Sequence, residues 1–388
     1  MRGLAAKLFQ VCDCDMTRKH PLEFRRAEVE AIMCCWQASE SCATVGVGSV
    51  GKSNLIQHLT DPEVQAHYLV GHDVTKFRAI LIDPNMLGVL PAHNGDRDAL
   101  QAWAGYELMM HRLYLAFHPF DMLSPQDARA FFETYQALQD GTNPLFAYIG
   151  IRYFELGLRF FLQQGFKLVY MFDEFEELLQ RFPVQFFQSL RGLRDQYKSQ
   201  LCYFTFSRTP LPVLVKQYGL PADKLEPFLE LFTDNVIYVG PYNDHDARRM
   251  IQRLLERRQS QLPEVSVDFL LAITGGFAGL LRAVCLLLID YQRQYTSLKF
   301  DDEMMVYLAS QPTVQAECTT IWNSLSNAEQ AILKSVSQVS EYVHDRESAD
   351  AVALLLRKQL VRFDREKKRL EIQPPLFAVF LGSLVNLQ

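Results

Sequence analysis

One stretch of eight residues constrains this chain more than any other. Residues 46–53 read Gly-Val-Gly-Ser-Val-Gly-Lys-Ser and fit the Walker A pattern G-x-x-x-x-G-K-[S/T] of a phosphate-binding loop. An apolar run at residues 42–45 predicts a buried strand before it, and residues 54–59 predict the start of a helix. Glycines allow the sharp turn between them, and free amides at a helix N-terminus attract phosphate. The predicted phosphate-binding residues are Gly46, Gly48, Ser49, Val50, Gly51, Lys52, Ser53 and Asn54.

Such a loop predicts a bound nucleoside triphosphate, ATP, together with Mg²⁺. Lys52 is expected to reach the β- and γ-phosphates, and Ser53 to ligate the metal. A second apolar run, residues 167–172, ends in Asp173 and Glu174, as a Walker B strand does. Asp173 would hold the Mg²⁺ shell and Glu174 would orient or deprotonate the attacking water. Alternatively, these acids only stabilise the N-terminus of the following helix, and both roles are compatible.

Composition limits the class of protein. With 388 residues the chain is long enough for two or three domains, and its 49% hydrophobic and 22% charged residues describe a globular protein. A formal net charge of −6 argues against a chain that binds polyanions over its whole surface. We find no apolar run of membrane-spanning length and no signal-like N-terminus, so we expect a cytoplasmic protein without a membrane partner. The eight cysteines include no C-x-x-C pair, which predicts free thiols.

Strands and helices alternate along the first part of the chain. Strands are predicted at residues 42–45, 77–83, 167–172, 201–206 and 235–239, with a helical insertion at 97–165. This alternation predicts a parallel, doubly wound α/β sheet whose ligands lie at the carboxyl ends of the strands. Those ends carry the phosphate loop, Asp83, Asp173 and the pair Ser207-Arg208. We expect Ser207 and Arg208 to face the γ-phosphate; the alternative is a cap at the strand end.

The second part of the chain is predicted to be helical. Residues 242–312 are interpreted as a helical lid that is interrupted at Gly275-Gly276. Arg282 is expected to reach back from this lid to the nucleotide; the alternative is a solvated side chain. Residues 313–388 are interpreted as a winged helix: a capping box at 326–329, two helices and two short strands around a charged turn. Its basic residues are interleaved with acids and its second helix is apolar, which favours contact with protein over DNA. The predicted domains are a lead-in at 1–41, a core at 42–241, the lid and the winged helix.

The order of these motifs resembles that of the STAND-type ATPases of the AAA+ superfamily, in particular the bacterial and archaeal AAA-like domain ATPases. The resemblance covers nearly the whole chain and rests on the following segments: Phe24-Arg25-Arg26, residues 46–53, Asp173-Glu174, Ser207-Arg208, Gly240-Pro241, Gly275-Gly276 and the predicted winged helix. It implies a P-loop ATPase whose nucleotide state closes, opens or oligomerises the protein. Lys52, Glu174 and Arg208 would be catalytic, and Ser53 and Asp173 would hold Mg²⁺.

The resemblance also implies that Arg26 contacts the nucleotide, because it matches the arginine of the family's F-x-G-R-E pattern. Arg25 and Ala27 depart from that pattern, and Gly-Gly-Phe-Ala at 275–278 replaces the family's Gly-Gly-His-Pro. Without the resemblance, a solvated basic helix start is an equally good interpretation of Arg26. From Thr209 to Gly240 no arginine is present to act in trans on a neighbouring subunit. Arg191 or Arg194 would have to substitute, and otherwise hydrolysis should be slow.

Three hypotheses follow. The first is a regulatory ATPase that acts through self-association or on a separate effector or sensor protein. The second is a DNA-associated AAA+ ATPase, similar to origin-recognition or transposition-regulator proteins, that binds DNA through the winged helix. The third is a structural protein that keeps nucleotide only to hold its fold, against which Glu174 argues because such a protein needs no residue that activates water.

Overall fold

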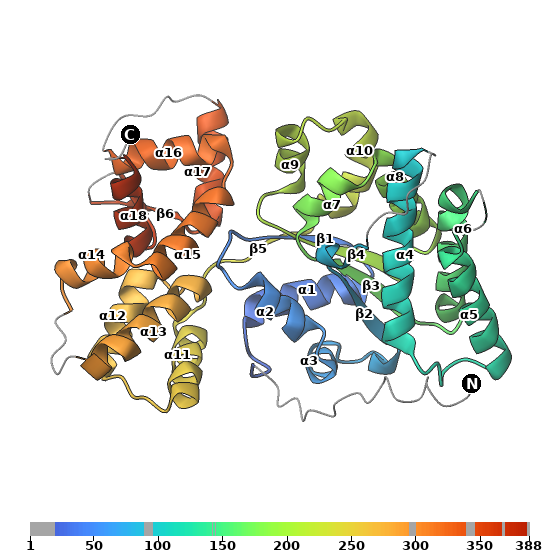
Figure 1. Cartoon of the computed structure of the whole chain (residues 1–388), viewed down its shortest axis with the longest axis horizontal. Coiled ribbons are helices and arrows are strands. Elements are labelled where there is room, and N and C mark those ends of the chain that lie inside the picture. The colour runs from blue at the N-terminus through green and yellow to red at the C-terminus, as the bar shows by residue number, and fades with distance from the viewer. Residues whose placement is uncertain are drawn as a thin grey trace.

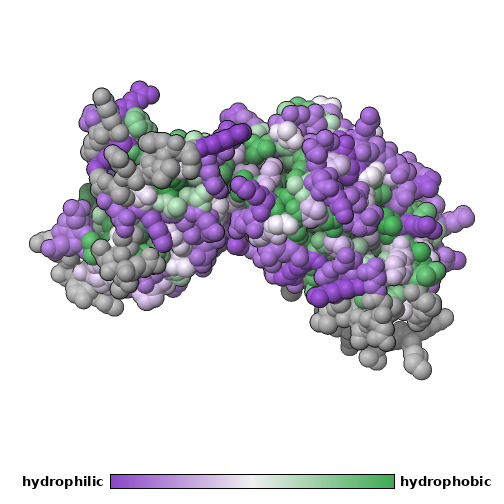
Figure 2. Space-filling view, turned by 90° about the horizontal axis from the view of Figure 1, so that it is seen from above, coloured by the Kyte–Doolittle hydropathy of each residue, from purple (hydrophilic) through white to green (hydrophobic). Residues whose placement is uncertain are grey.

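The molecule has two lobes, a sheet-containing lobe and a helical C-terminal lobe (Figure 1). The computed structural model describes residues 20–88, 96–141, 143, 145–294, 300–338, 346–366 and 369–385. Cys12, Cys14 and the predicted turn residues Lys367 and Lys368 lie outside these ranges. The described part of the chain contains no helix that is both long and apolar enough to cross a membrane. Seen from above, hydrophilic residues cover most of the described surface of both lobes (Figure 2).

A five-stranded parallel sheet forms the centre of the first lobe, in the order β2-β3-β4-β1-β5. The strands are β1 (Cys42–Val45), β2 (Phe77–Ile82), β3 (Lys167–Phe172), β4 (Leu201–Ser207) and β5 (Val236–Tyr238). β4 lies between the strand that leads into the phosphate loop and the strand that ends at Asp173, so the two motifs are brought to one edge of the sheet. The predicted α/β fold of a P-loop ATPase is confirmed.

Helices cover both faces of this sheet because its strands are apolar on both sides. In β3, Val169 and Met171 belong to one core, whereas Leu168, Tyr170 and Phe172 belong to the other. The first face is covered by α1 (Arg26–Ala38), α2 (Lys52–Leu59) and α3 (Pro62–Tyr68). The second is covered by α4 (Arg97–Phe117), α5 (Pro125–Gln139), α6 (Phe146–Leu162), α7 (Phe175–Arg181), α8 (Val184–Gln196), α9 (Leu211–Gln217) and α10 (Ala222–Leu229). The predicted helical insertion is therefore α4 to α6.

The C-terminal lobe packs as one unit. Its elements are α11 (Asp244–Arg258), α12 (Glu264–Thr274), α13 (Ala278–Gln294), α14 (Asp302–Ser310), α15 (Pro312–Asn323), α16 (Asn327–Ser337), α17 (Arg346–Arg357), β6 (Val361–Asp364), β7 (Arg369–Ile372) and α18 (Pro375–Val385). The capping box between Ser326 and Glu329 is present, and β6 pairs antiparallel with β7. α18 contacts α12 and α14, so the segments predicted as lid and as winged helix share one core. The winged-helix interpretation and the boundary between these segments stay predictions.

Candidate functional site

A cavity of about 300 Å³ lies where the phosphate loop meets the C-terminal lobe. From the first lobe it is lined by the phosphate loop, the acids that follow β3, and Arg208. From the second it is lined by side chains of α11, α13 and α15. Its lining residues are Val47, Gly48, Ser49, Val50, Gly51, Lys52, Ser53, Asn54, Asp173, Glu174, Glu176, Arg208, Met250, Ala278, Gly279, Arg282 and Thr320. Most of the residues predicted from the two Walker motifs thus line one cavity.

The backbone of the phosphate loop needs its glycines for two reasons. Gly51 has φ +94°, a left-handed conformation that side chains other than hydrogen disfavour. At Gly48 the loop touches α15, where an added Cβ would lie 2.6 Å from the Thr320 side chain. The amide of Gly46 donates to the Ser207 carbonyl at 3.0 Å, which fixes the start of the loop against β4. The loop is therefore both sharply turned and in direct contact with the second lobe.

Lys52 folds back onto the loop. Its Nζ donates to the carbonyl oxygens of Gly46 at 2.5 Å and of Val47 at 3.2 Å. Burial lowers the pKa of Lys52 from 10.5 to about 8; nearby Glu176 opposes this shift and Arg208 adds to it. These carbonyls hold the ammonium group in place of phosphate oxygens. A phosphate in the loop would exchange these hydrogen bonds for stronger, charge-assisted ones.

The acids that follow β3 are constrained by neighbours. Asp173 accepts a hydrogen bond from the Glu174 amide at 2.9 Å, and burial raises the pKa of its carboxyl group. Glu174 has φ +42°, which is unusual for a residue with a side chain. Its two carboxylate oxygens accept from Arg208 at 3.4 Å and from Asn85 Nδ2 at 3.3 Å. The expected water-activating residue is thus held by two partners, and Asn85 was not predicted from the sequence.

Glu176 is a further acid in the cavity that was not predicted to act there. Its side chain is 6% exposed, and Arg208 Nε lies 3.2 Å from its Oε1. Among the described residues neither of its carboxylate oxygens accepts a hydrogen bond, and burial raises its pKa. Arg208 therefore bridges Glu174 and Glu176. The acid-rich sequence after Asp173 was the available signal, but it was interpreted only as a helix cap.

Three predicted residues, Gly46, Ser207 and Arg26, do not line the cavity. Ser207 is buried, and its hydroxyl donates to the Thr209 carbonyl at 2.8 Å. Arg26 is 66% exposed and pairs with Glu30 at 2.7 Å on the surface of α1. The arginine beside the loop is instead the preceding residue.

Arg25 is 1% exposed and donates to the carbonyls of Val50 at 2.6 Å and Gly240 at 2.9 Å. Arg25 is the N-cap residue of α1 and has a left-handed backbone conformation. Its side chain therefore points into the protein, whereas the side chain of Arg26 points into solvent. The structure thus places Arg25, and not Arg26, against the phosphate loop, and the predicted nucleotide contact of Arg26 stays a prediction.

The remaining predicted arginines differ in their contacts. Arg282 lines the cavity, is exposed, and makes no hydrogen bond or ion pair with any described residue. Arg191 pairs with Asp195 at 2.8 Å, and Arg194 donates to the Ser39 carbonyl at 2.9 Å. Both of these are therefore engaged within the chain.

The C-terminal lobe reaches the phosphate loop at Ser49. The hydroxyl of Ser49 donates to the carboxylate of Glu317 on α15, and the amide of Gly279 donates to the Ser49 carbonyl at 2.8 Å. An anionic carboxylate thus lies against the loop that is predicted to bind phosphate. No local pattern predicted α15 or this contact.

The residues present fit a divalent cation held together with phosphate. Across the described residues no group of three or more His, Cys, Asp or Glu side chains could hold a metal alone. Mg²⁺ commonly keeps water and substrate phosphates as ligands, so the Ser53 hydroxyl and the Asp173 carboxylate suffice from the protein. Glu176 adds buried negative charge to the same cavity, which the Arg208 guanidinium at 3.2 Å partly offsets.

The comparisons with known proteins add fold-level similarity only. No family model matches the chain, and no curated protein is significantly similar to it. A Walker-type ATPase of Pyrococcus abyssi shares 14% identity over 92% of this chain and 95% of that one, with a TM-score of 0.49. The ORC2 protein of Aeropyrum pernix, in its ADPNP-ADP complexes, shares 13% over 94% and 93%, with a TM-score of 0.49. Cdc6p of Pyrobaculum aerophilum shares 10% over 96% and 97%, with a TM-score of 0.43. The P-loop ATPase fold is read from this chain's own strand order and phosphate loop.

Proposed function

We propose that the chain is a regulatory ATPase of the STAND type, in which ATP binding at the phosphate loop repositions the C-terminal lobe and thereby changes what the protein assembles with. The observation that carries this proposal is the contact of Ser49 with Glu317 and Gly279. It joins the loop that would hold phosphate directly to two helices of the second lobe.

Electrostatics makes this contact sensitive to nucleotide. Phosphate and the Glu317 carboxylate are both anions, and the loop amides and Ser49 hydroxyl cannot satisfy both. Two like charges about 4 Å apart repel by about 4 kcal/mol near a protein surface. A bound triphosphate therefore favours a state in which α15 has moved away from the loop. ADP, which lacks the γ-phosphate, would favour that state less.

The same cavity supplies the groups that hydrolysis requires. Lys52 would bind the β- and γ-phosphates, while Ser53 and Asp173 would hold Mg²⁺, which neutralises charge on the phosphate oxygens. Glu174 would orient or deprotonate water once Arg208 and Asn85 release its carboxylate. Arg191 and Arg194, the candidates for an arginine acting in trans, are engaged elsewhere. We therefore propose slow hydrolysis, as suits a switch.

A substitution at Glu317 tests the coupling. Glu317→Gln removes the competing charge but keeps a side chain of the same size, so ATP affinity should rise about five- to tenfold, or roughly 1–1.4 kcal/mol. Glu303→Gln, on an exposed position of α14, is the matched control for loss of one negative charge. Isothermal titration calorimetry with a non-hydrolysable ATP analogue gives both affinities. Equal affinity of the Glu317→Gln chain and the unmodified chain would refute the proposed competition.

The assembly part of the proposal needs a separate measurement. Molar mass by light scattering, with ADP, ATP and a non-hydrolysable analogue, should increase only with the triphosphates if the chain associates with itself. An unchanged mass together with a nucleotide-dependent change in radius would indicate a switch that acts on a separate effector or sensor protein. An unchanged mass and radius in all three states would contradict a conformational switch.

The DNA-associated alternative has less support among the described residues of the C-terminal segment. Lys358, a basic residue of this segment, is buried in an ion pair with Glu329 at 2.7 Å. Arg362 pairs with Glu371 at 3.0 Å. Lys358 is therefore not presented to a DNA backbone, and the charge of the exposed Arg362 is partly offset by Glu371. Salt-dependent DNA binding in fluorescence anisotropy, lost when both Lys367 and Lys368 are neutralised, would revive the alternative.

A further inference from the structure

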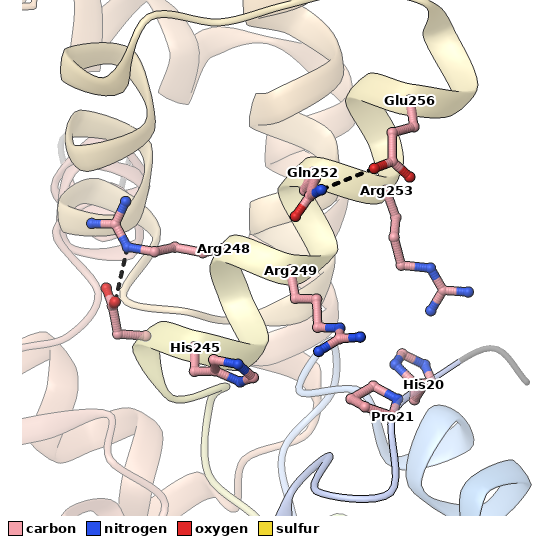
Figure 3. A pocket seen from close by; sticks show the side chains of 9 residues that line it. His20, Pro21, His245, Arg248, Arg249, Gln252, Arg253 and Glu256 are labelled. Atoms are coloured by element: carbon pink, nitrogen blue, oxygen red, sulfur yellow. Dashed lines mark hydrogen bonds and ion pairs between the residues drawn. The ribbon is translucent and has the colours of Figure 1, made fainter.

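A second and larger cavity, of about 740 Å³, lies on the other side of α11 from the phosphate loop. One wall is α11, and the opposite wall is the segment that precedes α1. Figure 3 shows Arg249 and Arg253 projecting from α11 toward His20 and Pro21. The lining residues are His20, Pro21, Asp244, His245, Arg248, Arg249, Gln252, Arg253 and Glu256. None of them belongs to a motif that was assigned from the sequence.

The arginines that line this cavity differ in whether they form ion pairs. Arg248 is paired with Asp244 at 2.8 Å and Asp268 at 2.6 Å. By contrast, Arg249 and Arg253 make no hydrogen bond or ion pair with any described residue. They lie one helical turn apart, at positions i and i+4, and so share one face of α11. Burial lowers the pKa of Arg253, the neighbouring Arg257 and Arg249 lower it further, and Glu256 opposes this shift.

The remaining walls of the cavity offer contacts to the part of a ligand that is not phosphate. The His20 ring stacks on Phe24 with centroids 3.9 Å apart, which holds the wall opposite the arginines in place. Pro21 adds an apolar surface. Gln252 and Glu256, joined by a hydrogen bond of 3.0 Å, offer neutral and acidic acceptors to ligand hydroxyl groups. A volume of about 740 Å³ falls within the range typical of small-molecule sites.

The two cavities have no lining residue in common. A third, small space of about 10 Å³ shares four lining residues with the outer cavity and Met250 with the phosphate-loop cavity. That volume is about what a single water molecule needs. The outer cavity and the phosphate-loop cavity are therefore lined by two different sets of side chains.

We propose that the cavity between α11 and the His20–Pro21 segment is a second binding site, for a phosphorylated small molecule of nucleotide size whose phosphate lies between Arg249 and Arg253. Planar guanidinium groups match phosphate oxygens through paired charge-assisted hydrogen bonds. The concave shape and the overall negative charge of the chain favour a small ligand over a nucleic-acid backbone. The site is distinct from the ATP site under the proposed function, and it stands whether or not that function is correct.

The test uses inorganic pyrophosphate as the probe and calorimetry as the readout. In the full chain carrying Lys52→Ala, which disables the phosphate loop, pyrophosphate should still bind saturably. Adding Arg249→Gln and Arg253→Gln should weaken that binding at least about tenfold, through loss of charged hydrogen bonds. Arg257→Gln with Arg258→Gln is the matched control, because it removes the same charge from the same helix outside the cavity. AMP should bind more tightly than pyrophosphate does if the walls contact a nucleoside.

Each other outcome overturns the proposal. Absence of pyrophosphate binding in the Lys52→Ala chain would remove the site. An equal loss of pyrophosphate affinity in the Arg257→Gln/Arg258→Gln chain would mean that binding depends on general surface charge. Weaker ATP binding in the Arg249→Gln/Arg253→Gln chain with Lys52 intact would make the cavity the far end of the ATP site. Length-dependent binding of a single-stranded oligonucleotide, abolished by the same pair, would assign the arginines to nucleic acid.

The measurement does not depend on the Lys52→Ala chain folding. If circular dichroism shows that chain to be unfolded, the unmodified chain is first saturated with a non-hydrolysable ATP analogue and then titrated with pyrophosphate. Binding that persists under saturation and is lost with the arginine pair supports the second site. Competition between pyrophosphate and the analogue, with no residual binding, refutes it.

Discussion

The phosphate-loop cavity and the α11 cavity both present cations to a ligand, but they hold those cations differently. At the phosphate loop, Lys52 donates to loop carbonyls and Arg208 pairs with Glu174 and Glu176. In the α11 cavity, Arg249 and Arg253 have no partner among the described residues. An anion at the first site must break internal contacts, whereas an anion at the second displaces only water. We infer that binding at the first site is coupled to conformation, and that binding at the second is not.

This difference indicates that the phosphate-loop cavity, and not the α11 cavity, is the site where ligand binding would change the conformation. Internal partners stabilise the arrangement described above, and a ligand shifts it only by binding an alternative arrangement more tightly. Ser49 extends the coupling to the second lobe through Glu317 and Gly279. The α11 cavity offers no such exchange of partners. The following predictions test this contrast, beginning with the largest expected effect.

Glu174→Gln should lower ATP hydrolysis by at least about 100-fold, because an amide cannot accept a proton from water and general bases contribute that much or more. ATP binding should be retained, so the triphosphate state accumulates. Steady-state phosphate release and nucleotide affinity are the two measurements. Glu177→Gln, an exposed acid on the same helix that pairs with Arg181, is the control and should hydrolyse normally. Equal turnover in the Glu174→Gln chain would exclude this residue as the base and direct attention to Glu176.

Lys52→Ala should weaken ATP binding about 100-fold, roughly 2.7 kcal/mol. The substitution removes the ammonium group that would exchange its hydrogen bonds to loop carbonyls for hydrogen bonds to phosphate oxygens. Lys76→Ala is the control, since Lys76 is half-buried and donates to the Gln164 carbonyl away from the cavity. Calorimetry with ATP measures both. Unchanged affinity would overturn the phosphate-loop assignment, and with it the claim that the two cavities differ in kind.

The ATP site should also respond to alkaline pH. The folded pKa of Lys52, about 8, lies below its ordinary value of 10.5, so between these values the unfolded chain binds more protons. The contribution of Lys52 to the free energy of unfolding, measured without nucleotide, should therefore increase with pH across that window. ATP binding needs the charged form, so its affinity should fall about tenfold at a pH about one unit above the folded pKa. Calorimetry across the range checks this, and a flat profile would contradict the buried ammonium group.

The sequence predicted the parts of the structure that depend on local pattern. β1 and β3 begin and end at the predicted residues, and the capping box of α16 is present, because apolar runs and caps act within a few residues. The phosphate loop and the Walker B acids were placed correctly in one cavity, since the carboxyl ends of parallel strands meet at one edge of a sheet.

Other parts of the site depend on contacts between distant residues. Ser49 and Glu317 are 268 positions apart, and nothing near Glu317 marks it as a partner of the phosphate loop. Arg25 and Arg26 are adjacent, and only the left-handed backbone of Arg25 decides which one lies under the loop. The α11 cavity likewise depends on where the segment before α1 meets a helix more than two hundred residues later. Such juxtapositions leave no periodic signal in a single sequence.

The smallest expected effect concerns salt, and it compares the two cavities directly. Arg249 is exposed and lies in an open groove, so added ions screen it, whereas charges in the buried phosphate loop are screened less. Raising salt from about 50 to about 200 mM should weaken pyrophosphate binding in the α11 cavity about threefold, as expected for few phosphate contacts. ATP binding at the phosphate loop, measured with Mg²⁺ held constant, should weaken less. The reverse order would mean that the free arginines are not the groups that hold the anion, and that the contrast between the two cavities is wrong.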